Sequence, residues 1–213
     1  MNILVTSGGT REYIDDVRVL TNISSGKLGA KIATAFAKAG HNVEYLCSKQ
    51  SAMPEDVAYT YCYVNGTQEV FDAMKNAVPR VDVVIHAMAV SDFGFKRDGA
   101  VKLKSNDPEA FIEYMRQNIV VNPKILSFIK GWNPDVFLVS FKFEVGKSLD
   151  ELHAIALESL VKNRCDLVVA NDKAMMSKRK RHVAYFVSPG GGISDEIVGK
   201  DAIAKRLLQA IKG

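Results

Sequence analysis

The sequence predicts a three-layer α/β domain in which helices cover both faces of a mostly parallel sheet. Strand-like and helix-like segments alternate along the chain, several strand segments are continuous apolar runs, and a glycine turn follows the first of them. The length of 213 residues fits one domain with a sizeable core, so we expect a single domain over residues 1–213. Uncharged runs stay well short of the roughly 20 residues that a membrane helix needs, and we expect no membrane segment.

The first half of the chain alternates as this fold requires. Residues 2–6 are apolar and β-branched and run into Gly8 and Gly9, which is typical of a first strand rather than a signal peptide. Apolar residues recur with a helical period over residues 25–39, and Gly40 is expected to end that helix. Further elements are strands at residues 43–47, 58–64 and 82–90, and a helix with Thr67 as its N-cap.

The second half begins with an irregular segment, residues 91–106, that is long for a connection within a compact domain. We therefore expect it to form a protruding arm. Asp-Pro at residues 107–108 and Asn-Pro at residues 122–123 are each expected to open a helix, the second with Asn122 as its cap. The remaining elements are strands at 135–143 and 166–170, a helix opened by the capping box of Ser148 and Glu151, a hairpin over 182–198, and a helix over 201–211.

Charge and cysteine content narrow the classes of function. The net charge of +4 favours an anionic small-molecule substrate. Three scattered cysteines without a CxxC pattern argue against a disulfide or zinc scaffold and for a reducing compartment. Four consecutive cations at residues 178–181 are most typical of a solvated face; phosphate attraction ranks second and nucleic-acid binding is unlikely, because no aromatic residues interleave with them.

Two polar loops follow strand ends, where parallel sheets bind their ligands. The first loop contains Gly8, Gly9 and Thr10. The second contains Asn22, Ser24, Ser25 and Gly26. Backbone N–H groups and hydroxyls in such loops hold anions, whereas a tight turn and an ordinary serine N-cap are the structural alternatives. Because both loops converge at one sheet edge, we favour an anion site.

Other polar side chains are expected near the same edge. Asp92 suits a Mg²⁺ ligand or a turn residue, while His86 lies in an apolar run and is interpreted as a core histidine. Lys102 and Lys104 alternate, so both ammonium groups would point to one face and suit a triphosphate, although a solvated lysine face is the commoner outcome. Phe141 either packs in the core or stacks on a base.

An NAD(P)-dependent Rossmann-type reductase is the enzyme alternative, because it also has a parallel sheet and a glycine loop. Tyr45 and Lys49 match the Tyr-x-x-x-Lys spacing of many such enzymes. They fall at a strand end, however, where helical i,i+4 geometry is absent, and the chain has no GxGxxG motif.

Several segments, taken in order, closely resemble the phosphopantothenate–cysteine ligase family of coenzyme A biosynthesis. They are GGTREYIDDVRVLTN with SSGKLG, AVSDF, KLK, NPKI, SFKFE and VANDKA, and the resemblance covers essentially residues 2–211. The first block and its spacing to the lysine arm are the most specific. The length resembles the stand-alone bacterial form, without the flavin-binding decarboxylase domain that is fused to the ligase in many bacteria.

The resemblance implies a reaction and an assembly. CTP, with Mg²⁺, would activate the carboxylate of 4′-phosphopantothenate as an acyl-cytidylate and release pyrophosphate. The amine of L-cysteine would then attack, giving 4′-phosphopantothenoylcysteine and CMP. Animal relatives use ATP, which remains the alternative nucleotide. The resemblance also implies a three-layer Rossmann-like fold, a cytoplasmic location and a homodimer in which the arm carries Lys102 across to the partner.

The family's site residues map onto this chain one by one. Asn22 would act in converting the acyl-nucleotide to product, and Lys102 would neutralise the triphosphate, so both are catalytic candidates; Asp92 is the candidate metal ligand. Nucleotide contacts map onto Ser24, Ser25, Gly26, His86, Ala87, Met88, Asp92, Lys102, Asn122, Pro123, Lys124, Ile125 and Phe141. Substrate contacts map onto Gly8, Gly9, Thr10, Asn22 and Ala89. Lys124 and Met88 depart from the family pattern, which has aspartate and alanine there.

Overall fold

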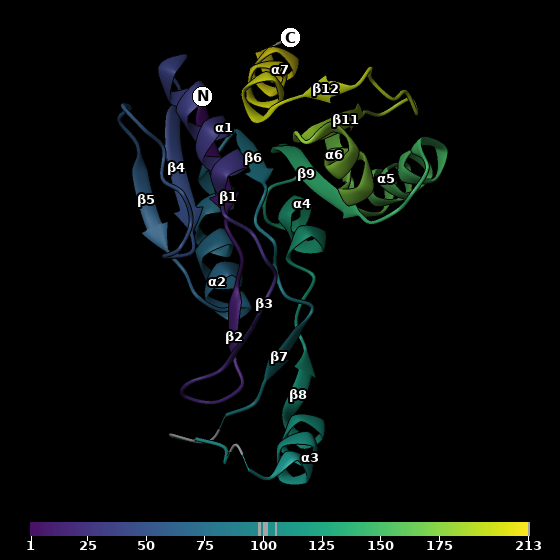
Figure 1. The fold of residues 1–213 in the computed structure, drawn as a ribbon. Coiled ribbons are helices and arrows are strands. Elements are labelled where there is room, and N and C mark those ends of the chain that lie inside the picture. The colour runs from purple at the N-terminus through teal and green to yellow at the C-terminus, as the bar shows by residue number, and fades with distance from the viewer. Residues whose placement is uncertain (98, 100–101, 105, 213) are drawn as a thin grey trace.

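The body of the molecule is an eight-stranded sheet, seen in a computed structural model that describes residues 1–97, 99, 102–104 and 106–212 (Figure 1). The pairing is parallel from one edge, β5, as far as β10, and β11 and β12 complete the other edge as antiparallel strands. In spatial order the strands are β12 (Ile197–Val198), β11 (Val183–Val187), β10 (Leu167–Asp172), β9 (Phe137–Glu144), β6 (Val83–His86), β1 (Asn2–Ser7), β4 (Asn42–Cys47) and β5 (Thr60–Tyr63).

Helices cover both faces, which makes the three layers that the apolar strands predict. One face packs against α1 (Lys27–Lys38) and α7 (Lys200–Lys212). The other face packs against α2 (Thr67–Ala77), η1 (Val78–Arg80), η2 (Ile125–Phe128), α4 (Ile129–Trp132) and α5 (Leu149–Asn163). The short helix α6 (Lys173–Arg179) follows β10. Within the described residues, no helix is both long and apolar enough to span a bilayer.

Local sequence signals explain several boundaries. The capping box of Ser148 and Glu151 opens α5 as expected, with Ser148 Oγ accepting from the Glu151 N–H. Thr67 is not an N-cap: it is the first residue of α2, and its N–H and hydroxyl both donate to the Glu12 carboxylate. Asn122 also caps no helix, because its amide donates to Thr67 Oγ1 and to the Ser91 carbonyl. Both predictions fail because partners distant in sequence take these side chains.

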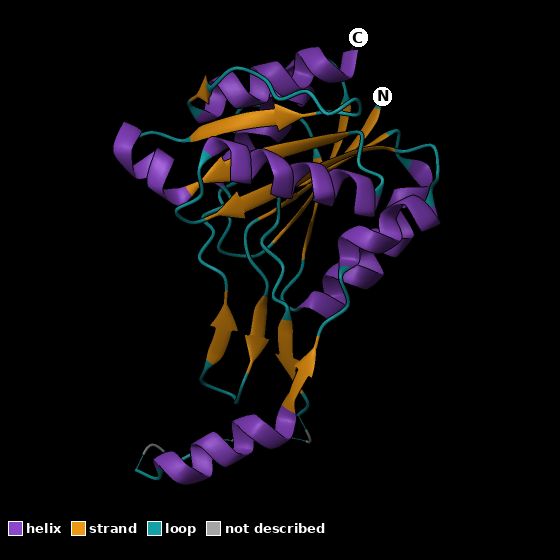
Figure 2. Ribbon diagram, turned by 90° about the vertical axis from the view of Figure 1, so that its right-hand side faces the viewer, coloured by secondary structure: helices purple, strands orange, loops and turns teal. Residues whose placement is uncertain are grey.

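A long arm extends from the carboxyl edge of the sheet (Figure 2). It contains two antiparallel pairs, β2 (Arg11–Tyr13) with β3 (Val19–Thr21) and β7 (Phe93–Phe95) with β8 (Ile119–Val121), and β2 lies against β7. Helix α3 (Pro108–Asn118) lies at the far end. We call residues 11–21 and 93–121 the arm. It is larger than the expected segment 91–106, because residues 11–21 and residues 107–121 also belong to it.

Candidate active site

The order of the sheet reverses direction between β1 and β6, and we call the region beyond the carboxyl ends of these two strands the crevice. The chain leaves β1 toward β4 on one side and later returns to β6 on the other, which is the position at which open α/β sheets bind ligands. Beyond the two strands the loops stay paired: Ala89 N–H donates to the Gly8 carbonyl at 2.8 Å, and Thr10 N–H donates to the Ala89 carbonyl at 3.1 Å. The first predicted loop therefore forms the wall of the crevice.

Three glycines line this crevice, and the packing leaves no room for side chains on them. Gly8 has φ +88°, and a Cβ there would lie 1.9 Å from Ser51 Oγ. A Cβ on Gly9 would lie 2.5 Å from the Asn22 carbonyl oxygen. Gly26 has φ +69°, and its Cβ would lie 2.8 Å from Ser51 Cβ. We call Gly8, Gly9 and Gly26 the glycine cradle; all three are buried, and their close packing brings the two predicted loops together.

A buried serine cluster supports the cradle from behind. Ser7 Oγ donates to the Gly26 carbonyl at 3.0 Å, and Ser51 Oγ donates to the Ser7 carbonyl at 3.2 Å. Ser48 and Ser51 hydroxyls lie 2.9 Å apart. Nothing in the sequence singled out this cluster, because Ser48 and Ser51 follow β4 in a segment without a motif. Their position after a strand that neighbours β1 is the signal that could have found them.

The second loop reaches the mouth of the crevice. Gly26, not a serine, is the N-cap of α1, and no side chain caps that helix, so the first-turn N–H groups of α1 remain available to an anion. Ser24 is half-buried and Ser25 is exposed. Asn22 is exposed as well, and its side-chain amide donates to the Val90 carbonyl at 3.2 Å. Asn22 thus joins the second loop to the loop that follows β6.

His86 is the buried core histidine that the sequence predicts. Its Nδ1 lies 2.8 Å from Thr6 Oγ1, and the same hydroxyl accepts from the Met88 N–H. Burial lowers the pKa of His86 to about 4, so the imidazole is neutral at pH 7. A neutral, hydrogen-bonded ring at the end of β6 positions the backbone of Ala87 and Met88. It is not a cationic phosphate ligand.

The loop after β6 presents one exposed carboxylate. Asp92 forms an ion pair with Lys124, the residue that departs from the family pattern. The side chain of Asn122 is fully engaged with Thr67 and Ser91, so it shapes the loop around Asp92. Among the described residues, no three His, Cys, Asp or Glu side chains group as a metal site. A single oxygen donor of this kind fits Mg²⁺, which keeps water and takes phosphate oxygens as further ligands.

Other predicted nucleotide contacts lie in or beside the core. Met88 and Ile125 are buried in the core on the α2 and α5 side of the sheet. Phe141 is half-buried and packs on the opposite face, among residues of the α1 and α7 side. Ala87, Ala89 and Pro123 are half-buried, which leaves their backbone near the surface. The side chains of Met88 and Ile125 are therefore packing residues, and contact with a nucleotide would come through their backbone.

The structure does not bring Lys102 to the crevice of its own chain. The Leu103 N–H donates to Asp15, in the turn between β2 and β3, so Lys102 lies at the end of the arm that points away from the sheet (Figure 2). Lys102 and Lys104 are exposed while Leu103 is half-buried, which agrees with the expected alternation. The residue that the resemblance makes catalytic is thus separated from Asn22 by the length of the arm.

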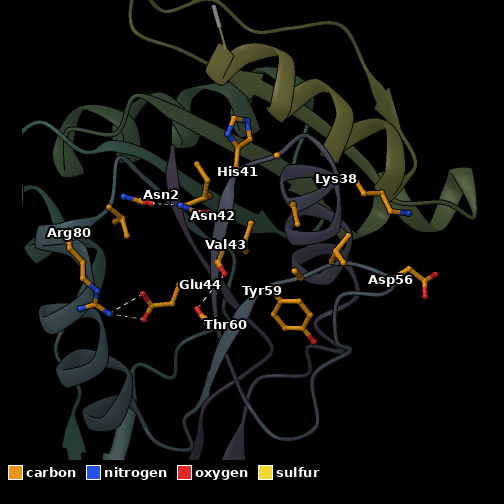
Figure 3. A pocket seen from close by; sticks show the side chains of 16 residues that line it. Asn2, Lys38, His41, Asn42, Val43, Glu44, Asp56, Tyr59, Thr60 and Arg80 are labelled. Carbon is orange, nitrogen blue, oxygen red and sulfur yellow. Dashed lines mark hydrogen bonds and ion pairs between the residues drawn. The ribbon is translucent and has the colours of Figure 1, made fainter.

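A hollow of about 1040 Å³ lies at the opposite edge of the sheet, at the amino ends of β1, β4 and β5 (Figure 3). Arg80 donates to both carboxylate oxygens of Glu44 at 3.0 Å, so these two charges of the hollow are paired with each other. Ligands of open α/β sheets bind at the other edge. We therefore assign the chemistry to the crevice.

The structure does not place Tyr45 where the Tyr-x-x-x-Lys pattern of an NAD(P)-dependent reductase would need it. Tyr45 is fully buried in β4, its hydroxyl donates to the Ala52 carbonyl at 2.7 Å, and burial raises its pKa. A phenol in that setting cannot act as the proton donor that the Tyr-x-x-x-Lys pattern requires. The cationic run, residues 178–181, is exposed, and Arg179 forms an ion pair with Glu196.

Comparison with known proteins identifies relatives over the whole chain. The model of the family described as "DNA/pantothenate metabolism flavoprotein C-terminal domain" matches residues 1–213. The coenzyme A biosynthesis bifunctional protein CoaBC of Thermococcus kodakarensis is 35% identical over 212 residues, which are 99% of this chain and 47% of that protein. CoaBC of Mycobacterium tuberculosis is 31% identical over 79% of this chain and 41% of its own length. The chain thus spans about half the length of the curated relatives it matches.

Solved structures agree with the fold. A crystal structure of the DNA/pantothenate metabolism flavoprotein from Streptococcus pneumoniae has a TM-score of 0.87 and 33% identity, covering 100% of this chain and 98% of that one. A Cab2 variant in complex with phosphopantothenate-cysteine has a TM-score of 0.75 at 18% identity, covering 98% of this chain and 85% of that one. The second likeness concerns the fold alone. Together these structures confirm the three-layer Rossmann-like prediction.

Proposed function

Because this chain belongs to the family of DNA/pantothenate metabolism flavoprotein C-terminal domains, we propose that it is a phosphopantothenate–cysteine ligase of coenzyme A biosynthesis. The observation that carries the proposal is the glycine cradle at the β1/β6 crevice, on a chain that the family matches from end to end. The relatives are named for coenzyme A biosynthesis, and one structural neighbour is a complex with phosphopantothenate-cysteine.

The proposed reaction has two steps. A carboxylate oxygen of 4′-phosphopantothenate attacks the α-phosphorus of CTP, and the bond to the β-phosphate breaks to release pyrophosphate. The amine of L-cysteine then attacks the acyl carbon; the bond to CMP breaks, and the amine loses a proton. Neither step needs a nucleophilic side chain. Consistent with this, burial raises the pKa of the Cys165 thiol and raises that of Cys47 to about 11, so both thiols stay protonated at neutral pH.

The residues of the chain divide this work between them. The glycine cradle and the first turn of α1 would bind phosphate through backbone N–H groups, and Lys102 would add a positive charge. Asn22, at the mouth of the crevice, would orient the acyl carbonyl for attack by the amine. Mg²⁺, when bound with the phosphates, would neutralise their charge, and Asp92 is the residue that would hold it.

A second copy of the chain would complete the site. The arm exposes large apolar side chains at Val17, Ile112, Ile119 and Val121, and exposed apolar surface of this kind supports an interface. We propose a homodimer in which each arm delivers Lys102 to the crevice of the partner. Sedimentation of the wild-type chain is expected to give a dimer, and Val121→Asp is expected to shift it toward monomer. A wild-type monomer at micromolar concentration would contradict this assembly.

The ligase activity is tested by supplying 4′-phosphopantothenate, L-cysteine and Mg²⁺ with CTP, ATP, GTP or UTP in parallel. Pyrophosphate and CMP are expected with CTP, with the product identified by mass. Omission of cysteine should leave the acyl-nucleotide without CMP. A preference for ATP would correct the nucleotide and keep the ligase. Absence of pyrophosphate with all four nucleotides would overturn the proposal, and NADH binding measured by fluorescence would then favour the reductase alternative.

A further inference from the structure

The turn between β2 and β3 contains a carboxylate that is completely withdrawn from solvent. Asp15 has an exposed fraction of 0% although it lies on the arm, where few side chains are buried. Burial alone would raise its pKa, but hydrogen bonds from the N–H groups of Val17, Leu103 and Arg18, and the Arg18 charge, lower it. Asp15 is therefore ionised at neutral pH. A buried carboxylate is retained only when its partners satisfy it.

The partners of Asp15 lie on two distant segments. Its Oδ1 accepts from the N–H groups of Val17 at 2.9 Å and of Arg18 at 2.7 Å, which closes the turn. Its Oδ2 accepts from the Arg18 guanidinium and, at 3.2 Å, from the N–H of Leu103, which lies 88 residues further along the chain. One carboxylate thus closes the turn and also holds the segment that carries Lys102 and Lys104.

Arg18 holds the same segment from the other side. Its Nη1 donates to the Leu103 carbonyl at 3.3 Å, so both backbone groups of Leu103 are bound by the Asp15–Arg18 pair. The Arg18 guanidinium also lies over the ring of Phe111 in α3, 5.4 Å from its centroid. The pair therefore links the β2–β3 turn, the lysine segment and α3 at one point.

Leu103 stands between Lys102 and Lys104, which are both exposed. A backbone that is bound at its N–H and its carbonyl has a defined orientation. This orientation also limits the directions in which the side chains of the two neighbouring residues can point. Within the described part of the chain, neither lysine side chain makes a hydrogen bond or an ion pair. Their direction depends on Leu103, and Leu103 depends on the buried pair.

We propose that Asp15 and Arg18 are positioning residues that orient the Lys102 backbone for phosphate binding, without touching the substrate themselves. The proposal rests on the ligase function proposed above, which gives Lys102 its task. It predicts that the pair acts on catalysis only through Lys102. A misplacement of a catalytic group by about 1 Å can cost on the order of 100-fold in rate, so loss of the pair should be visible in turnover.

The first measurement needs no activity. Hydrogen exchange of the wild-type chain should show a protected Leu103 amide, and Asp15→Asn should lose that protection. Arg18→Lys, which keeps the charge and loses the fork, should lose it in part. Asp72→Asn is the matched control, because Asp72 is an exposed carboxylate that accepts from Gln68 on α2, outside the arm. Unchanged protection of Leu103 in Asp15→Asn would overturn the positioning role.

The second measurement is a double-mutant cycle on the kinetics. Asp15→Asn is expected to lower kcat/KM with the nucleotide by about 10- to 100-fold while the thermal midpoint stays close to that of Asp72→Asn. Combined with Lys102→Arg, it should add little further loss, because both changes affect one function. Independent, multiplying losses would mean that Asp15 does not act through Lys102 and would overturn the proposal. A wild-type chain that releases no pyrophosphate with any nucleotide would refute the ligase function, while the exchange result would still decide whether the pair holds Leu103.

Discussion

Helix α1 of the sheet body and helix α3 of the arm have nearly the same length, 12 and 11 residues, but they bury very different surfaces. Five residues of α1 are buried against the sheet, among them Ile32 and Phe36, whereas α3 buries none. The body is stabilised by its own apolar core. The arm is held by a few polar contacts, such as those of Asp15, and exposes its apolar side chains. The difference indicates that the body folds around its own core, while the arm leaves apolar side chains exposed to contact with another surface.

The sharpest test of this division is Lys102→Gln on the arm. Removing a charge that stabilises a developing phosphate charge is expected to lower kcat/KM by about 10²- to 10³-fold. The free energy of unfolding should not change, because the Lys102 side chain is exposed. Steady-state pyrophosphate release and urea unfolding measure the two effects. Unchanged activity would mean that Lys102 is an ordinary surface residue and that the arm contributes no charge to catalysis.

His86 tests the body by pH. Its pKa is about 4 in the folded chain and about 6.5 when unfolded, so the unfolded chain binds a proton between these values that the folded chain does not. Stability is therefore greatest above pH 6.5 and falls as the pH decreases toward 4, by about 3 kcal/mol from this residue. His86→Gln should flatten the curve measured by urea unfolding. Part of the slope should remain, because burial also lowers the pKa of His182 to about 4.

The glycine cradle tests whether the body is as closely packed as its contacts indicate. Gly9→Ala would place a Cβ 2.5 Å from the Asn22 carbonyl oxygen, and the backbone would have to shift. We expect a loss of about 2 kcal/mol in the free energy of unfolding together with a loss of activity. Gly192→Ala is the control, since nothing lies within 4 Å of a Cβ there. Equal effects of the two substitutions would mean that the crevice can relax.

Asn22 lies where the arm meets the body. We expect its substitution to have a smaller effect than the substitutions of Lys102, His86 and Gly9. Asn22→Asp keeps the shape of the side chain but removes the amide donor that now binds the Val90 carbonyl. The second step is expected to slow by about tenfold, which corresponds to roughly 1.4 kcal/mol, so that acyl-nucleotide accumulates. Quenched-flow mass spectrometry would detect it. Normal turnover without the intermediate would contradict the role proposed for Asn22.

The features that could be predicted from the sequence are those that depend on residues close together in the chain. The alternating apolar segments predicted the parallel sheet, and the side chains of Ser148 and Glu151 find each other within one helical turn, so the capping box was predicted correctly. Thr67 and Asn122 carry equally good capping side chains, but Glu12 and Ser91 bind them across distances of 55 and 31 residues. Such long-range partners leave no periodic signal in one sequence.

The candidate site divides in the same way. The sequence identified the two loops by their glycines and hydroxyls near strand ends, and the structure brings these glycines together. It could not identify the serines behind them, because Ser7, Ser48 and Ser51 meet only once β1 and β4 pair. The arm was underestimated for a related reason: residues 11–21 and 93–121 are far apart in sequence and meet only in the folded chain, through the contact of β2 with β7 and the hydrogen bonds of Asp15 and Arg18 to Leu103.

The length of the arm has a genetic consequence. If each crevice receives Lys102 from the other copy, the two functional residues of one site come from different chains. A copy carrying Lys102→Gln still offers an intact crevice, and a copy carrying Asn22→Asp still offers an intact arm. Two alleles that each lower activity should then give more activity together than either gives alone when expressed in the same cell, because mixed dimers contain one complete wild-type site. Conversely, a double variant with both changes on one chain should fail to rescue either single variant.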